Sequence, residues 1–475
     1  MRLIKGFILV LFLGIGACGE SPVIMPERNT TVSIVGDQFH INGMPTYEGR
    51  EWTTSDGGVY PVEGLLMNAR LVQGVFDDLN PNTRGQWIYP DTKKWDADRN
   101  SREFVNAMAS WREHGLLSFT LNLQGGCPYG YCQDQPWDNS AFAPDGSLRD
   151  EYMLRLDQIL SRADELGMVV ILGYFYFGQD NNLENEQAVI AAVENVTKWV
   201  LEKGFTNVIV EINNECNIRY DHEILQCARV HELISIAKNI SVDGRSLYVS
   251  TSLGGGGVPP ANIVEASDYI LLHGNGVRDP ARMENMINQV REMDEYSPMP
   301  VVNNEDDQPW RVEDQGWGEE GNNFVVCVRN YASWGFFDFR FESEHYDYNQ
   351  GYQSIPVNWQ ISSERKRDFF RMLAEITGSP GTPIVDAGFS EEFGNVTASI
   401  EGVSSDTVIE QVLLVVNDDI VAVLEEEPFE FSLSEIPEKE HWIKIRVIYS
   451  SSGEEVIIES PYYRNPWWPY GGPSR

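Results

Sequence analysis

Two segments of the chain end alike, with polar side chains directly after an apolar run. Val208–Glu215 and Met299–Glu305 are each rich in β-branched residues and each finish in Asn-Asn-Glu. Such runs are typical of buried parallel strands, and α/β proteins place their chemistry at the carboxyl ends of parallel strands. Glutamates presented by two different strands are the paired carboxyl groups that glycoside hydrolysis requires.

The elements that would position these glutamates alternate between strand and helix. Because short strand–helix connections give parallel strands, we predict an α/β fold, a (β/α)8 TIM barrel over residues 31–383. A doubly wound open sheet is the rival, but no Gly-x-Gly-x-x-Gly follows the first strand. The expected strands are Leu65–Val75, Leu117–Leu123, Val169–Phe175, Val208–Asn213, Leu247–Ser252, Tyr269–His273, Pro300–Asn304 and Gly335–Phe341. The expected helices are Asn100–His114, Arg149–Leu166, Gln187–Lys203, Glu223–Asn239, Pro280–Glu295, Gly321–Ser333 and Ser362–Thr377.

All-β segments flank this region on both sides. Thr31–Glu48 contains Gly-Asp and Asn-Gly turn signals and is expected to form a hairpin that caps the barrel. Residues 384–475 hold short alternating runs separated by turn residues, the pattern of a small immunoglobulin-like sandwich followed by an aromatic tail. Its expected strands are Val412–Val416, Ile420–Leu424, Phe429–Leu433, Ile443–Tyr449 and Val456–Glu459.

The first residues predict export. Arg2 and Lys5 precede a short apolar run, and the segment that ends at Cys18 resembles a bacterial lipobox. The resemblance implies that residues 1–18 are a lipoprotein signal with a lipid on Cys18, and residues 19–30 then form a tether. The expected location is the bacterial cell envelope, as an outer-membrane lipoprotein facing the periplasm or cell surface. The lipid would be the only attachment to the membrane, since no other apolar run is long enough to cross it.

The net charge limits the classes of partner, and the spacing of the cysteines limits the disulfides and metal sites that the protein can form. The net charge of 35 − 72 = −37 argues against nucleic acid or an anionic membrane surface and favours neutral sugars. Cys127 and Cys132 bracket a loop that a disulfide could close, and Cys216 lies eleven residues before Cys227. Each of these cysteines and Cys327 could form a disulfide or stay a buried free thiol. Their spacing matches no zinc site. No cofactor is expected, and the oligomeric state is left open.

The two Asn-Glu strand ends resemble those of clan A glycoside hydrolases, a (β/α)8 group with catalytic glutamates at the ends of the fourth and seventh strands. The resemblance covers about residues 31–380. It implies that Glu215 is the acid/base, Glu305 is the nucleophile, and Asn214 binds the sugar 2-hydroxyl. The implied reaction is retaining hydrolysis of a β-linked polysaccharide or oligosaccharide by double displacement.

Further substrate-binding candidates lie at other strand ends. His273 closes the sixth strand where the clan often has a His and a Tyr, but no Tyr is present. Arg70 matches an early-strand Arg of the clan, with an ion pair at the barrel rim as the alternative. Because Trp334 precedes the eighth strand, Trp310 is the substitute for the aromatic platform usual there. The remaining candidates are Asn122, Gln124, Tyr176, Gln179 and Asn275.

Two other functions compete with hydrolysis by a glutamate pair. The missing Tyr would suit a non-catalytic glycan-binding lipoprotein on a glycosidase-like barrel. Acidic pairs at Asp77-Asp78 and Asp306-Asp307 raise calcium binding or metal-dependent hydrolysis, although solvated loop carboxylates are the simpler interpretation and no metal site is assigned. The sugar, the linkage and the choice between internal and terminal cleavage depend on loops and stay open.

Overall fold

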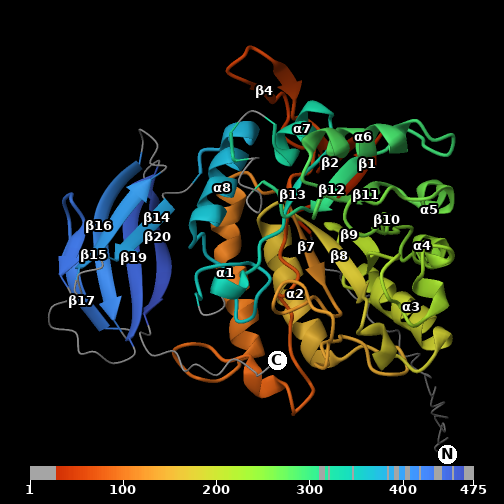
Figure 1. Ribbon diagram of the computed structural model, residues 1–475, viewed down its shortest axis with the longest axis horizontal. Coiled ribbons are helices and arrows are strands. Elements are labelled where there is room, and N and C mark those ends of the chain that lie inside the picture. The colour runs from red at the N-terminus through yellow and green to blue at the C-terminus, as the bar shows by residue number, and fades with distance from the viewer. Residues whose placement is uncertain are drawn as a thin grey trace, which may run out of the picture.

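The computed structural model describes residues 28–309, 316–318, 321–344, 347–381, 384–389, 395–401, 407–416, 419–432, 441–451 and 454–464. The signal segment, Cys18, Trp310 and the aromatic tail lie outside these residues. The structure is a mixed α/β region followed by an all-β region (Figure 1). None of the helices in the described ranges combines the length and hydropathy that a bilayer-spanning helix needs.

Eight parallel strands carry the α/β region. Six form one sheet in the order β10-β9-β8-β7-β6-β13, and β11 pairs with β12. Parallel bridges from Val302 to Ser333 and from Asp306 to Phe336 connect β12 with β13, and the Asp268 N–H donates to Val249 O at 3.0 Å between β10 and β11. The strands are β6 Asn68–Arg70, β7 Ser118–Asn122, β8 Val169–Tyr176, β9 Val208–Asn214, β10 Val249–Ser250, β11 Ile270–His273, β12 Val301–Glu305 and β13 Gly335–Phe336.

Each strand overlaps a predicted one, but the first, fifth and eighth are much shorter than expected. The apolar run after Arg70 continues as a loop in which Leu71, Val72 and Val75 are buried. Hydrophobicity cannot distinguish a buried strand from a buried loop, so the prediction was too long there.

Helices follow the strands and pack on both sides of them (Figure 1). Their starts are capped as sequence chemistry requires: Asp96, Asn185 and Ser363 each accept a backbone N–H of the first turn of α1, α3 and α8. Each predicted helix overlaps an observed one, but α4 begins seven residues later than expected and α7 is much shorter, and among the described residues α5 was not predicted. The helices are α1 Ala97–Glu113, α2 Asp150–Glu165, α3 Glu186–Glu202, α4 Val230–Asn239, α5 Ala261–Ala266, α6 Pro280–Arg291, α7 Asn323–Arg329 and α8 Glu364–Thr377.

The predicted N-terminal hairpin closes the amino end of the parallel strands. β1 (Val32–Val35), β2 (Gln38–Ile41) and the short β3 (Met44–Pro45) form an antiparallel sheet. Val32 and Phe39 pack in one apolar cluster with residues from the amino ends of the parallel strands, including Ile171, Ile209 and Val302. A second hairpin, β4 (Glu51–Thr53) with β5 (Val59–Pro61), was not predicted. Because the hairpin covers the amino ends of the parallel strands, a functional site is expected at their carboxyl ends.

The all-β region consists of two antiparallel sheets, β14-β15-β18 and β17-β16-β19-β20. Phe431 of β18 shares an apolar cluster with Val412 of β16 and Val447 of β19, so the sheets meet over a common core. Five of these strands were predicted, and β14 and β15 were missed. The strands are β14 Ile384–Phe389, β15 Asn395–Glu401, β16 Thr407–Val416, β17 Asp419–Leu424, β18 Glu430–Ser432, β19 His441–Ser451 and β20 Glu454–Arg464.

Candidate active site

The carboxyl ends of β9 and β12 bring two glutamates together. Glu215 follows the last residue of β9, and Glu305 is the last residue of β12. One carboxylate oxygen of each and one ring nitrogen of His273 all lie within 4.8 Å of one another. Glu215 is 7% exposed and Glu305 4%. An oxygen–oxygen separation within 4.8 Å is compatible with the ~5–5.5 Å between carboxyl groups in retaining glycosidases.

The backbone at Glu215 is held in an unusual conformation. Its φ of 56° lies in the left-handed region, which non-glycine residues adopt only where their surroundings enforce it. The N–H of Glu215 donates to Ser252 Oγ at 3.0 Å, and the N–H of Cys216 donates to Ser252 O at 2.9 Å. A disulfide between Cys216 and Cys227 closes the loop that follows. These contacts direct the Glu215 carboxyl toward His273, whose Nδ1 is 3.0 Å from Oε1.

Three side chains surround the carboxylate of Glu305. Arg70 Nε lies 2.7 Å from Oε2, Asn275 Nδ2 donates to Oε1 at 3.1 Å, and His273 Nδ1 is 3.5 Å from Oε2. Arg70 is 1% exposed, so its ion pair is a buried contact in this site and not a rim contact. Arg70 Nη2 also donates to Asn214 Oδ1 at 2.7 Å, so the same guanidinium contacts both Glu305 and Asn214.

A third glutamate, Glu211, lies beneath this pair and was missed from the sequence. It is fully buried, with Oε1 3.8 Å from His273 Nε2 and Oε2 4.0 Å from Arg70 Nη1. Ser252 Oγ donates to Oε1, and Asn304 Nδ2 donates to Oε2 at 3.2 Å. Burial opposes ionisation, but the neighbouring His273 and Arg70 hold the pKa of Glu211 below its usual range. A charged residue inside the apolar run Val208–Ile212 was the signal that could have revealed it.

The surroundings of Glu305 favour one proton on the pair Glu215–Glu305. Burial raises the pKa of Glu305 to about 7, opposed by Arg70 and His273, and the charges of Glu215 and Glu211 add to the rise. Since neighbouring carboxylates repel, this proton belongs to the pair Glu215–Glu305. The 2.7 Å contact with Arg70 is made by Glu305, and it favours the ionised form of that carboxyl.

His273 is the second positive charge. Burial alone would lower its pKa, but the carboxylates of Glu305, Glu211 and Glu215 raise it to about 10. An imidazolium cannot ligate a metal, because coordination requires the neutral ring. A cation bound by Glu215, His273 and Glu305 would therefore have to displace the His273 proton.

This proton makes stability depend on pH. We expect the free energy of unfolding to fall as pH rises from about 6.5 to about 10, because the folded protein holds the His273 proton more tightly than the unfolded chain. The contribution is fully present below the ordinary pKa of 6.5 and lost through about 10. Glu211→Gln removes a counter-charge and should cost about 3 kcal/mol at pH 6.5 while flattening this slope.

Urea unfolding at several pH values measures both effects. Glu265→Gln, at an exposed position of α5, is the matched control and should keep the wild-type slope. An undiminished slope in Glu211→Gln would contradict the assigned charge of His273.

The other candidates divide into site residues and structural residues. Tyr176 is buried near both glutamates, and desolvation together with the charges of Glu305 and Glu215 raises its pKa. Asn122 is 2% exposed, and its amide has no hydrogen-bond partner among the described residues. The amide of Gln124 is engaged within the protein: Oε1 accepts from Tyr176 N, and Nε2 donates to Ser140 Oγ and Gln179 O. Gln124 is therefore assigned a structural role. The amide of Gln179 is likewise used, by Asn139 N and Trp137 O.

The acidic pairs near the site are not solvated, contrary to expectation. Asp306 is fully buried and accepts from Trp334 Nε1 at 2.8 Å and from Asn323 Nδ2 at 3.0 Å. Burial raises its pKa to about 8, with a further rise from Asp307. Trp334 is accordingly a core residue. Asp78 is fully buried too, and it accepts from Trp87 Nε1 at 2.8 Å. The prediction was wrong because composition does not show which loops the tertiary fold covers.

The cysteines around the site are paired. Cys127 bonds to Cys132 and Cys216 to Cys227, whereas Cys327 is a buried free thiol. Both disulfides therefore close loops that follow strands β7 and β9 at the carboxyl end of the sheet.

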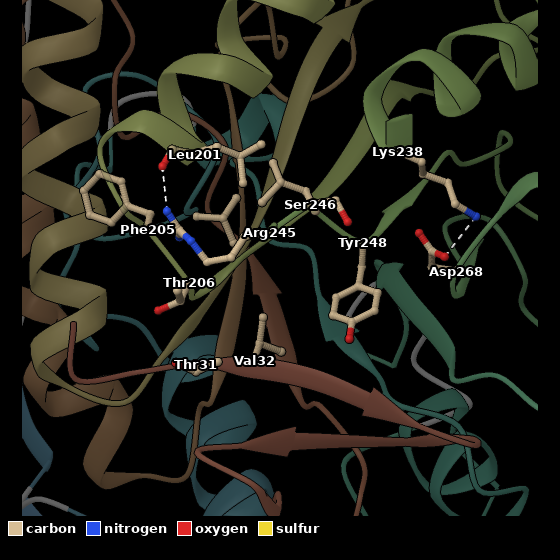
Figure 2. A pocket seen from close by; sticks show the side chains of 12 residues that line it. Thr31, Val32, Leu201, Phe205, Thr206, Lys238, Arg245, Ser246, Tyr248 and Asp268 are labelled. Atoms are coloured by element: carbon tan, nitrogen blue, oxygen red, sulfur yellow. Dashed lines mark hydrogen bonds and ion pairs between the residues drawn. The ribbon is translucent and has the colours of Figure 1, made fainter. Parts of the chain in front are cut away.

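A separate cavity of about 350 Å³ lies at the opposite, amino end of β9 (Figure 2). It is lined by Val32 of β1, Phe205, Thr206 and the segment before β10. Its charged side chains are already used: Arg245 Nη2 donates to Leu201 O at 2.9 Å, and Lys238 Nζ pairs with Asp268 at 2.9 Å. This cavity shares no residue with the glutamate pair.

The sequence matches no protein-family model and no curated protein. Several similar solved structures are glycoside hydrolases. An FMN-binding beta-glucuronidase from Facaelibacterium prausnitzii L2-6 has 12% identity and a TM-score of 0.39, covering 91% of this chain and 58% of that one. A glycoside hydrolase family 5 protein from Bacteroides vulgatus ATCC 8482 has 11% identity and a TM-score of 0.43, covering 87% and 92%. A Cellulomonas fimi endo-beta-1,4-mannanase double mutant has 12% identity and a TM-score of 0.33, covering 73% and 86%. The chain spans less than two thirds of the length of the glucuronidase.

Proposed function

We propose that the protein is a retaining glycoside hydrolase, built on a closed (β/α)8 barrel, that cleaves a β-linked polysaccharide or oligosaccharide. The observation that carries this proposal is the convergence of Glu215 and Glu305 within 4.8 Å, with Arg70 2.7 Å from Glu305 alone. In this proposal the Arg70 contact keeps Glu305 ionised for attack and Glu215 acts as the proton donor, the two roles that double displacement requires.

The reaction runs in two displacements. Glu305 attacks the anomeric carbon while Glu215 gives its proton to the departing glycosidic oxygen, so the C–O bond breaks and a covalent glycosyl-enzyme forms. Glu215 then takes a proton from water, the water oxygen attacks the same carbon, and Glu305 leaves as a carboxylate. Two inversions give net retention. Asn214, oriented by Arg70, donates its amide to the sugar 2-hydroxyl.

His273 suits this exchange of charge. During the first displacement the negative charge moves from Glu305 to Glu215, and His273 Nδ1 lies 3.5 Å from the former and 3.0 Å from the latter. The same imidazolium can therefore stabilise either carboxylate, and the total charge of the cluster does not change. A preorganised charge of this kind needs no rearrangement during the reaction.

A panel of aryl β-glycosides and polysaccharides tests the proposal. NMR should show a β-configured first product, and a 2-deoxy-2-fluoro glycoside of the preferred sugar should label Glu305, detected by peptide mass spectrometry. Binding without turnover across the panel would instead identify a non-catalytic glycan-binding lipoprotein. Activity that is lost with chelator and restored by metal would indicate metal-dependent hydrolysis.

We also propose that residues 1–18 direct export and lipidation, and that residues 384–475 form an immunoglobulin-like module. Cys18→Ser should abolish incorporation of labelled palmitate and release the protein from the membrane fraction of an expressing bacterium. Unchanged labelling would remove the lipoprotein assignment without touching the hydrolase proposal.

A further inference from the structure

A half-exposed tyrosine stands beside the glutamate pair on a disulfide-closed loop. Tyr131 is 50% exposed, and its hydroxyl accepts from Asn275 Nδ2 at 3.3 Å and donates to Asp307 Oδ2 at 3.4 Å. The same Asn275 nitrogen donates to Glu305 Oε1 at 3.1 Å. The ring thus adjoins the proposed nucleophile, although it comes from the loop after β7 and not from the sixth strand.

The loop is fixed along its length. The Cys127–Cys132 disulfide closes it, and Gln353 Nε2 donates to Cys127 O at 3.0 Å and to Gly130 O at 2.9 Å. Gly130 has a φ of 109°, and a Cβ there would lie 2.5 Å from the Phe339 ring, so only glycine fits. Loops are usually mobile. The number of contacts that hold this loop indicates that its position is important for function.

Tyr129 and Tyr131 of this loop pack against different parts of the protein. The ring of Tyr129 packs 5.1 Å from Trp87, and its hydroxyl donates to Gln86 Oε1 at 3.0 Å. Tyr131 instead meets Phe337 and Phe339 in T-shaped contacts at 5.7 and 4.9 Å. These contacts hold the Tyr131 ring in place, and half of the residue remains exposed.

The second disulfide loop is tied to the first. Arg219, between Cys216 and Cys227, donates from Nη2 to Cys132 O at 2.9 Å. The loop that follows Glu215 and the loop that carries Tyr131 are therefore held at a fixed spacing across the site.

We propose that Tyr131 binds substrate, as an aromatic platform for a sugar ring, and that the Cys127–Cys132 disulfide positions it. A pyranose has an apolar face of C–H groups and a polar edge, which match a half-exposed aromatic ring bordered by the Asn275 amide. This inference rests on the proposed hydrolase function. Trp310, the platform expected from the sequence, lies outside the described residues.

Kinetics on the glycoside or oligosaccharide that the wild type cleaves fastest test the platform. Tyr131→Ala should raise KM about tenfold with kcat changed less than about threefold, because an aromatic contact of this size is lost while the glutamates stay in place. Tyr131→Phe keeps the ring and should restore a KM near that of the wild type. Tyr129→Phe is the matched control on the same loop and should change neither constant. The double variant Cys127→Ser/Cys132→Ser should raise KM as Tyr131→Ala does.

The outcomes separate this inference from the function on which it rests. An unchanged KM in Tyr131→Ala, or a fall in kcat alone, would overturn the platform while hydrolysis by Glu215 and Glu305 stood. A wild type that cleaves no glycoside would overturn both. If circular dichroism shows that the cysteine variant is unfolded, the comparison of Tyr131→Ala with Tyr131→Phe still decides.

Discussion

Glu305→Ala is expected to lower kcat for glycoside hydrolysis by about ten-thousandfold or more, because the substitution removes the carboxylate that bonds to the anomeric carbon in the proposed reaction. Added azide should restore turnover on an activated aryl glycoside, since the small anion fits where the carboxylate was. A single displacement then produces a glycosyl azide of inverted configuration, which NMR identifies from the anomeric coupling constant.

The truncation leaves Arg70 without its partner at 2.7 Å, so stability must be followed as well. Glu305→Gln keeps an acceptor for Asn275 and nearly the same volume, and it should be as inactive as the alanine variant while unfolding at a temperature closer to that of the wild type. Glu265→Ala, on the exposed side of α5, should retain full activity. Either Glu305 variant retaining most of its activity would refute the nucleophile assignment.

Glu215→Ala should behave differently, because protonation matters most when the leaving group is poor. We expect kcat to fall by about a hundred- to ten-thousandfold on a natural glycosidic bond. A 2,4-dinitrophenyl glycoside needs no proton and should still form the glycosyl-enzyme rapidly. Azide should then give a product of retained configuration, the opposite of the Glu305→Ala result.

The pH profile provides an independent test of Glu215. For the wild type, kcat/KM on a poor leaving group should fall about tenfold per pH unit above about 7, where the pair loses its last proton. The group must be protonated to act as an acid, so the loss lies on the alkaline side. In Glu215→Ala this limb should disappear for the dinitrophenyl substrate. A wild-type profile that stays level to pH 9, or an alkaline limb that survives the substitution, would rule out Glu215 as the acid.

Local sequence was sufficient to place the two acids on strands. Apolar β-branched residues followed by Asn-Asn-Glu locate β9 and β12, and turn chemistry at Gly36 and Asn42 locates the hairpin beneath the sheet. Strand order then requires both carboxyl ends to lie on one face, because parallel strands share their direction. The end of the predicted sixth strand, compared with the clan it resembles, also identified His273 and Asn275 beside β11.

Only the tertiary structure decided which of the two carboxyls contacts Arg70. Arg70, on β6, lies next to Glu305 and not next to Glu215, and no local pattern encodes that choice between residues so distant in the chain. Glu211 was missed for the same reason: a glutamate in an apolar run shows a buried charge but not its partners, His273 and Arg70. Tyr131 was overlooked because its loop reaches the site through the Cys127–Cys132 bond and the packing on Phe339.

By itself, the sequence determined the kinds of group available and the strand ends that present them, since both follow from local chemistry and from periodicity. The tertiary structure decided the charge on each group, because a pKa depends on burial and on neighbouring charges brought in from other strands. It also decided that Tyr131 contacts Asn275 beside Glu305, because that depends on how loops from separate strands pack on one another.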